Sequence, residues 1–168
     1  MRKNENNFAY IDGANLHKSI ANLGWKLDYK RFRVWLTEKY GVTKAYLFIG
    51  MLPRYTDLYT RLQDAGYTLV FREVSYDRDG KAKGNCDADL VVRCMQDLYE
   101  HAFDRAILVT SDGDYVSLLR FLADKDKLHT ILSPSMENRC SILIKRTGAS
   151  IVYINDRRSN LEYKSIAA

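Results

Sequence analysis

Short apolar runs that alternate with helix-like segments constrain the fold of this chain more than any other feature. The expected strands are residues 8–11, 44–49, 67–74, 105–110, 127–132 and 150–154. The expected helices are residues 15–22, 28–39, 54–65, 87–101, 114–125 and about 137–146, and residues 75–84 read as a loop or hairpin. Regular alternation of this kind predicts an α/β fold, with a parallel sheet of five to six strands and helices on both faces.

Composition supports a single folded domain and indicates a weak preference for a polyanionic partner. The chain has 168 residues, of which 46% are hydrophobic and 28% charged, enough to form a core. Lys and Arg outnumber Asp and Glu by 26 to 21, for a net charge of +5. This excess fits a polyanionic partner without establishing one. The domain is expected to span residues 1–155, followed by a polar, loosely ordered tail at 156–168.

Membrane, secreted and zinc-binding proteins are the classes that the sequence argues against. Apolar runs such as 106–109 are too short to span a bilayer, and the N-terminus lacks the apolar region of a signal peptide. The three cysteines, Cys86, Cys94 and Cys140, are odd in number and lack Cys-x-x-Cys spacing. We therefore expect a cytoplasmic protein with no membrane partner, and a homo-oligomer is left open.

Aspartates stand where two expected strands end and where one helix begins. Asp12 follows the first strand, Asp112 and Asp114 follow the strand at 105–110, and Asp87 opens a helix. Each alone is an ordinary helix cap. If the two strands are neighbours, an inference from the fold type, the carboxylates converge and repel one another. A divalent cation removes that conflict, and an all-oxygen site selects Mg²⁺ or Mn²⁺ over zinc.

Polar residues near these aspartates are candidates for contacts with a phosphate. Asn15 follows Asp12 by three residues, and Thr110 and Ser111 place hydroxyls before the next helix, although capping explains all three equally well. Lys83 precedes Asp87 and is placed to hold a phosphate, the alternative being a solvated loop charge.

Basic and aromatic side chains form a second, weaker indication of nucleic-acid binding. Tyr55, Tyr59 and Tyr76 are candidates for stacking on bases, although most tyrosines pack in cores. Candidate members of a basic rim are Arg54, Arg61, Arg72, Arg139, Lys145, Arg146, Arg157 and Arg158. Solvated surface charges are the default reading of these residues.

Three segments together resemble the NYN family, a branch of the PIN-like nuclease folds. They are Tyr10–Leu16 (YIDGANL), Lys83–Leu90 (KGNCDADL) and Leu108–Leu119 (LVTSDGDYVSLL). Their order and spacing match the family over about residues 8–155. The resemblance implies a PIN-like, Rossmann-like α/β fold with a metal-dependent ribonuclease site.

The resemblance also assigns roles to particular residues. By position, the acidic, catalytic and metal-holding cluster corresponds to Asp12, Asp87, Asp112 and Asp114, and the polar and hydroxyl-bearing partners to Asn15, Thr110 and Ser111. The chain departs from the family at Arg93, where many relatives have another aspartate. Either Asp89 compensates for that loss or Arg93 faces the substrate.

The function expected from the sequence is metal-dependent endoribonuclease activity, with hydrolysis of RNA phosphodiester bonds at an aspartate-held Mg²⁺ or Mn²⁺ site. The alternative is a catalytically weak RNA-binding or protein-interaction module on the same fold. A phosphohydrolase or phosphotransfer receiver is a third possibility, which Lys127 and Ser133 fit poorly.

Overall fold

Six parallel strands form the central sheet of the molecule, in the order β3-β2-β1-β6-β7-β8. The computed structural model describes residues 4–51, 53–83 and 87–165. The strands are β1 (Asn7–Asp12), β2 (Val42–Met51), β3 (Tyr67–Glu73), β6 (Ala106–Val109), β7 (Leu128–Ser133) and β8 (Ile151–Tyr153). This sheet confirms the parallel α/β architecture predicted from the alternating pattern.

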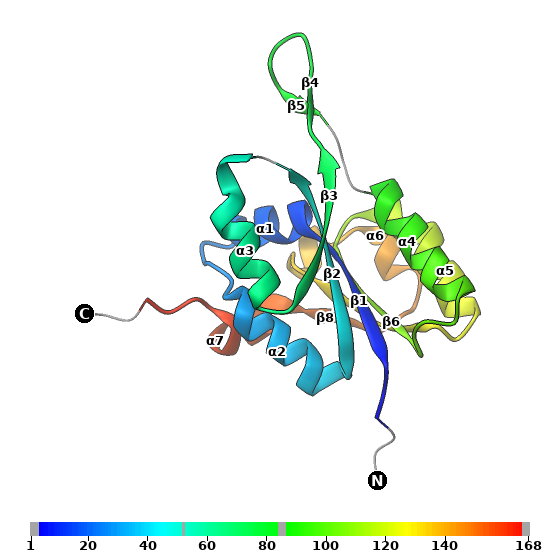
Figure 1. The fold of residues 1–168 in the computed structure, drawn as a ribbon. Coiled ribbons are helices and arrows are strands. Elements are labelled where there is room, and N and C mark those ends of the chain that lie inside the picture. Colours follow the sequence, from blue (N-terminus) through cyan, green and yellow to red (C-terminus); the bar gives the residue numbers. More distant parts are fainter. Residues whose placement is uncertain (1–3, 52, 84–86, 166–168) are drawn as a thin grey trace.

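Helices cover both faces of the sheet, as Figure 1 shows. One face carries α1 (Gly13–Asn22), α2 (Tyr29–Tyr40), α3 (Thr56–Asp64) and α7 (Arg158–Leu161). The other carries α4 (Asp87–Tyr99), α5 (Val116–Asp124) and α6 (Ile142–Lys145). Single 3₁₀ turns are η1 (Pro53–Tyr55), η2 (Gly113–Tyr115), η3 (Glu137–Arg139) and η4 (Ile154–Arg157). The single helix expected at 137–146 is instead η3 and α6, because Cys140 is extended and the Ser141 side chain caps α6.

Strand β1 lies at the centre of the sheet and separates two apolar cores. Ala9 and Ile11 pack with α1 and α2, whereas Phe8 and Tyr10 pack with α4 and α5 on the opposite face. Alternate side chains of a strand point to opposite faces, so a strand buried on both faces is apolar throughout. This double burial explains why β1 appears in the sequence as a continuous apolar run.

The strand order reverses between β1 and β6. From β1 the chain builds outward through β2 to β3, and it then returns to place β6 on the other side of β1. Ile11 is paired with Val109, so the carboxyl ends of β1 and β6 are adjacent. Ligands of open parallel sheets bind at such a switch point. The adjacency that the sequence argument assumed is therefore present.

The C-terminal segment is more ordered than the sequence suggested. Residues 154–161 form η4 and α7, and Leu161 is buried in the core beneath α1 and α2. The carbonyl of Leu161 accepts a hydrogen bond from the Asp28 N–H at 2.8 Å, and the Tyr163 N–H donates to the Lys26 carbonyl at 2.7 Å. The expected loose tail is therefore wrong up to about residue 163, because one leucine anchors an otherwise polar segment.

A two-stranded hairpin lies outside the main sheet. Strands β4 (Ser75–Tyr76) and β5 (Ala82–Lys83) pair antiparallel after β3, and in Figure 1 they rise beyond the carboxyl ends of the parallel strands. Within the described part of the chain, no helix is both long and apolar enough to cross a membrane.

Candidate metal centre

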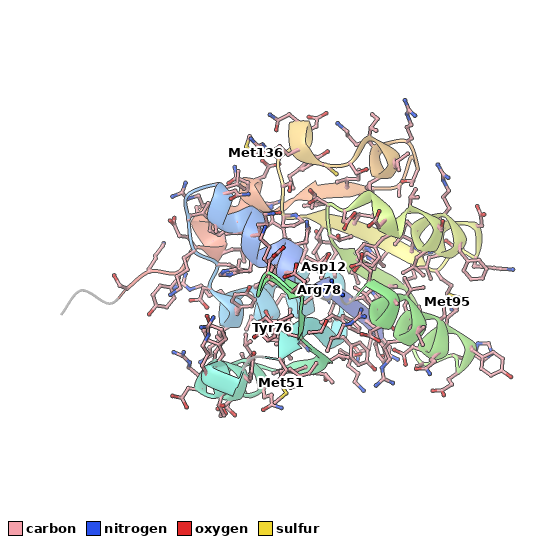
Figure 2. The ribbon with its side chains drawn as sticks, turned by 90° about the horizontal axis from the view of Figure 1, so that it is seen from above. Asp12, Met51, Tyr76, Arg78, Met95 and Met136 are labelled. Atoms are coloured by element: carbon pink, nitrogen blue, oxygen red, sulfur yellow. The ribbon has the colours of Figure 1, made fainter. Side chains whose placement is uncertain are left out.

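Three aspartates meet at the carboxyl edge of the sheet, where the strand order reverses. Asp12 ends β1, Asp87 begins α4 and Asp112 caps η2. Each offers a carboxylate oxygen, and these oxygens lie within 4.8 Å of one another. Figure 2 looks down on this edge and places Asp12 near its centre. Residues far apart in the sequence are thus gathered into one acidic cluster, which we define as Asp12, Asp87 and Asp112.

Asp12 is both a helix cap and a member of the acidic cluster. Its Oδ1 accepts a hydrogen bond from the Asn15 N–H at 3.2 Å, and its Oδ2 accepts one from the Thr110 hydroxyl at 3.4 Å. Only 8% of the residue is exposed. The next residue, Gly13, begins α1 so close to β2 that an added Cβ would lie 2.6 Å from the Phe48 carbonyl oxygen. Glycine is therefore required there for space.

Thr110 joins two members of the acidic cluster. Its hydroxyl donates to Asp12 and accepts a hydrogen bond from the Asp112 N–H at 3.1 Å. The Thr110 side chain is fully buried. Asp112 in turn accepts a hydrogen bond from the Asp114 N–H at 2.9 Å, which caps η2. Thr110 thus positions carboxylates and does not present its hydroxyl to solvent.

Tyr115 is a member of the site that the sequence argument missed. Its hydroxyl donates to Asp87 Oδ1 at 2.7 Å, and the residue is only 1% exposed. Burial, followed by the negative charge of Asp12, raises the pKa of Tyr115 well above its usual value. The phenol therefore stays protonated and orients the Asp87 carboxylate.

Burial and mutual repulsion make the acidic cluster unfavourable when all its members are ionised. Burial is the largest cause that raises the pKa of Asp12 to about 6, and the charges of Asp87 and Asp112 add to it. The hydrogen bonds from Asn15 and Thr110 lower the pKa but do not cancel these effects. A buried carboxylate with a raised pKa among like charges is typical of functional sites.

The raised pKa of Asp12 predicts how stability without metal depends on pH. Because the folded-state pKa is about 6 and the unfolded value 3.8, Asp12 favours the folded state below about pH 4, and this contribution is lost as pH rises through 6. The loss is on the order of 3 kcal/mol, since one pKa unit corresponds to about 1.4 kcal/mol. Urea unfolding in EDTA between pH 4 and 8 measures this change in the free energy of unfolding. The difference between the parent and Asp12→Asn isolates the contribution of Asp12, and a difference that does not change with pH would contradict the prediction.

The donor set and its dimensions suit one hard divalent cation. Two oxygens on opposite sides of a Mg²⁺ ion lie about 4.2 Å apart, because each metal–oxygen distance is about 2.1 Å. Oxygens within 4.8 Å of one another need only a small inward movement to reach that spacing. Carboxylate oxygens favour Mg²⁺ or Mn²⁺. The acidic cluster therefore fits the metal that the sequence suggested.

A chain of polar side chains lies beside the acidic cluster. Asn15 Oδ1 accepts hydrogen bonds from the Ser111 N–H at 2.9 Å and from its hydroxyl at 3.1 Å. The Ser111 hydroxyl lies 2.8 Å from that of Ser135, which donates to the Ser19 hydroxyl at 3.1 Å. Asn15 and Ser111 were expected near the aspartates, whereas Ser19 and Ser135 carried no sequence signal. The chain of hydrogen bonds thus reaches the acidic cluster through Asn15, whose N–H donates to Asp12.

Three other predicted site residues are not members of the acidic cluster. The Asp114 side chain is exposed and is not one of the three clustered carboxylates. Arg93 is exposed on α4, with its guanidinium carbon 5.2 Å from the centre of the Tyr46 ring. Lys83 ends β5, and its side chain lies outside the described part of the structure. The metal role of Asp114 and the substrate roles of Arg93 and Lys83 stay predictions.

The three candidate stacking tyrosines differ in their surroundings. Tyr59 is buried, donates to the Gly50 carbonyl at 3.2 Å and packs edge-on against Phe71, with 4.8 Å between the ring centres. The expectation that Tyr59 stacks on a base is therefore wrong, because its ring belongs to the contact between α3 and β3. Tyr55 and Tyr76 are exposed.

The parallel sheet of this protein is Rossmann-like, and carboxylates are gathered at its switch point. These two features place it in the PIN-like class of α/β proteins. The chain belongs to the NYN domain family, whose model matches residues 8–148. This is a family of PIN-like nucleases, and the clustered aspartates suit the divalent metal that such nucleases typically use.

A solved structure supports the assignment of the fold. The chain is similar to a protein of unknown function, VPA0982, from Vibrio parahaemolyticus RIMD 2210633, with 21% identity and a TM-score of 0.77. The alignment covers 97% of this chain and 99% of the other. Comparison with curated proteins gives no significant match.

Proposed function

We propose that this protein is a metal-dependent endoribonuclease that hydrolyses RNA phosphodiester bonds. The observation that carries the proposal is the acidic cluster, whose carboxylate oxygens lie within 4.8 Å of one another at the switch point of the sheet. Membership of a family of PIN-like nucleases supports it. We also propose a cytoplasmic location, in keeping with the buried, unpaired thiols of Cys94 and Cys140.

The residues of the acidic cluster would hold Mg²⁺ or Mn²⁺ through carboxylate oxygens. When bound, such a cation polarises the phosphoryl group and activates water, so that no histidine base is required. Asp12 and Asp112 are held toward each other by Thr110, and Tyr115 orients Asp87. Asp114 follows at the rim of the site, where an exposed carboxylate can act through water.

Substrate contacts are proposed for the polar groups beside the acidic cluster. The oxygen of the Asn15 amide is occupied by Ser111, which leaves the amide nitrogen to donate to a phosphate oxygen. The Ser111 hydroxyl lies in the same polar chain, and Lys83 and Arg93 are proposed to contact the RNA at a greater distance. Hydrolysis by this route should leave a 5′-phosphate and a 3′-hydroxyl.

Cleavage of a labelled RNA by the purified chain, with Mn²⁺, with Mg²⁺ and with EDTA, tests the proposal. We expect cleavage with a divalent cation and none in EDTA. The Asp112→Asn variant, purified in the same way, should be inactive, which excludes a contaminating nuclease. Cleavage that persists in this variant at the parent rate, or that fails with both cations, would contradict the proposal.

One observation favours a second candidate function, a catalytically weak RNA-binding or protein-interaction module. The guanidinium of Arg93 is stacked on Tyr46, at a position where the family resemblance leads us to expect an aspartate. Loss of a carboxylate would weaken metal binding while leaving a surface for RNA. Near-micromolar RNA binding without turnover in either cation would support this candidate.

A further inference from the structure

The β4–β5 hairpin projects over the acidic cluster. Figure 1 shows it above the carboxyl ends of the strands, and Figure 2, seen from above, places Arg78 of the hairpin beside Asp12 in projection. The two views together put the hairpin directly above the switch point. We call residues 75–83 the hairpin arm.

The turn of the hairpin arm has a defined conformation. Asp77 Oδ1 accepts hydrogen bonds from the N–H groups of Asp79 and Lys81, both at 2.9 Å. The Asp77 N–H donates to the Lys81 carbonyl at 2.9 Å, and Gly80 has a φ of +75°, which glycine adopts without strain. The Asp77 carboxylate is therefore part of the turn itself. An ordered turn presents its side chains without a large entropic cost on binding.

An exposed aromatic ring and two cations are the groups that the hairpin arm presents. Tyr76 is 62% exposed, and Arg78 and Lys81 are exposed in the same turn. Asp79 is an exposed carboxylate between them, so charge alone is a modest attraction for a polyanion. Stacking on the Tyr76 ring is then the main contact that the hairpin arm can offer to a nucleic acid.

A second aromatic ring lies at the same edge of the sheet. Tyr55 ends η1, directly beyond the end of β2, and is 41% exposed. The guanidinium carbon of Arg54 lies 4.9 Å from the centre of its ring. Seen from above in Figure 2, Tyr76 lies in projection between Asp12 and Met51, the last residue of β2. Tyr55 and Tyr76 are thus two exposed rings beyond the carboxyl ends of the strands, and exposed rings with basic side chains nearby in the chain are typical of surfaces that bind single strands.

We propose that the hairpin arm holds RNA against the acidic cluster, with Tyr76 stacked on an unpaired base and Arg78 and Lys81 contacting phosphates. This inference rests on the proposed ribonuclease function and names the element that grips its substrate. The base must be unpaired, because the faces of bases in a duplex are already covered by their neighbours. A protein partner is less favoured, because two exposed cations share the hairpin with the ring and the described turn carries no extended apolar surface.

Binding of a fluorescein-labelled, mixed-sequence RNA of 12 nucleotides, measured by anisotropy in EDTA, tests the inference without requiring cleavage. We expect Tyr76→Ala to raise the Kd of the single strand about tenfold, as loss of one stacked base does, and Tyr76→Phe to restore it. Tyr99→Ala is the matched control, because Tyr99 is 87% exposed but lies at the far end of α4. Its Kd should equal that of the parent, and a duplex of the same sequence should bind more weakly than the single strand.

The outcomes separate this inference from the proposed function. RNA binding that depends on Tyr76, without cleavage in Mn²⁺ or Mg²⁺, would support the proposed role of the hairpin arm and contradict the proposed ribonuclease activity. A Tyr76→Ala variant that cleaves RNA with the Kd and KM of the parent would contradict the proposed role of the hairpin arm. The proposed ribonuclease activity would then stand. The inference also fails if the parent binds no RNA, if it prefers the duplex, or if Tyr99→Ala weakens binding as much as Tyr76→Ala.

Discussion

Replacing Asp12 with asparagine is expected to stop RNA cleavage and, in protein without metal, to raise the melting temperature. Cleavage is lost because asparagine is a neutral and weak ligand for a hard cation. Stability rises because the ionised carboxylate is buried beside Asp87 and Asp112, whereas asparagine carries no charge and still caps α1. The same change thus acts in opposite directions on activity and on stability.

The expected magnitudes are large enough to measure. We expect the rate of cleavage to fall at least 100-fold, because even residues that only support metal ligands cost 10–100-fold when they are removed. At pH 7.5 in EDTA, a gain of about 1–3 kcal/mol should raise the melting temperature by roughly 2–12 °C. Thermal unfolding and a cleavage assay on the same preparation measure both.

Asp28→Asn is a matched control for this change. Asp28 caps α2 by accepting a hydrogen bond from the Arg31 N–H at 3.0 Å, as Asp12 caps α1, but it is not part of the acidic cluster. The control should cleave RNA like the parent and should not gain stability without metal. An Asp12→Asn protein that melts no higher than this control would show that repulsion in the acidic cluster is small.

Comparison of these two caps shows how much of the site the sequence could predict. Asp12 and Asp28 each directly precede the helix that they cap, and aspartate is a common residue at that position. The position of Asp12 after a buried strand added the expectation of a site at the sheet edge. Whether Asp12 meets Asp112 depends on β1 and β6 being neighbours, and only the folded topology establishes that.

Contacts that depend on side-chain direction were beyond the sequence argument. Asp112 and Asp114 are two residues apart and looked alike, yet Asp112 joins the acidic cluster and Asp114 points to solvent, because η2 turns the chain between them. Tyr115 and Tyr59 are both buried in the structure. The Tyr115 hydroxyl donates to Asp87 and the Tyr59 hydroxyl donates to the Gly50 carbonyl. The periodicity of the sequence does not predict which group each hydroxyl will contact.

Replacing Tyr115 with phenylalanine is expected to weaken Mn²⁺ binding about 10–100-fold while the fold is kept. Phenylalanine fills the same space in the core beneath α4 and α5, but it removes the hydrogen bond of 2.7 Å to Asp87 Oδ1. Without that donor the Asp87 carboxylate is free to turn away from Asp12 and Asp112. Losses of this size are typical when a partner of a metal ligand is removed. Calorimetric titration of the metal-free protein with Mn²⁺ measures the change.

Tyr10→Phe separates this effect from the loss of a buried hydroxyl. Tyr10 is also fully buried, in the same core, and donates to the Asp97 carboxylate at 2.7 Å, but neither residue belongs to the acidic cluster. This control should lose stability, because a buried carboxylate loses its donor, and it should bind Mn²⁺ like the parent. If both variants lost affinity equally, the cause would be general loosening of the core. If only Tyr115→Phe lost it, the Tyr115 hydroxyl would be established as the group that holds Asp87 in place for a cation.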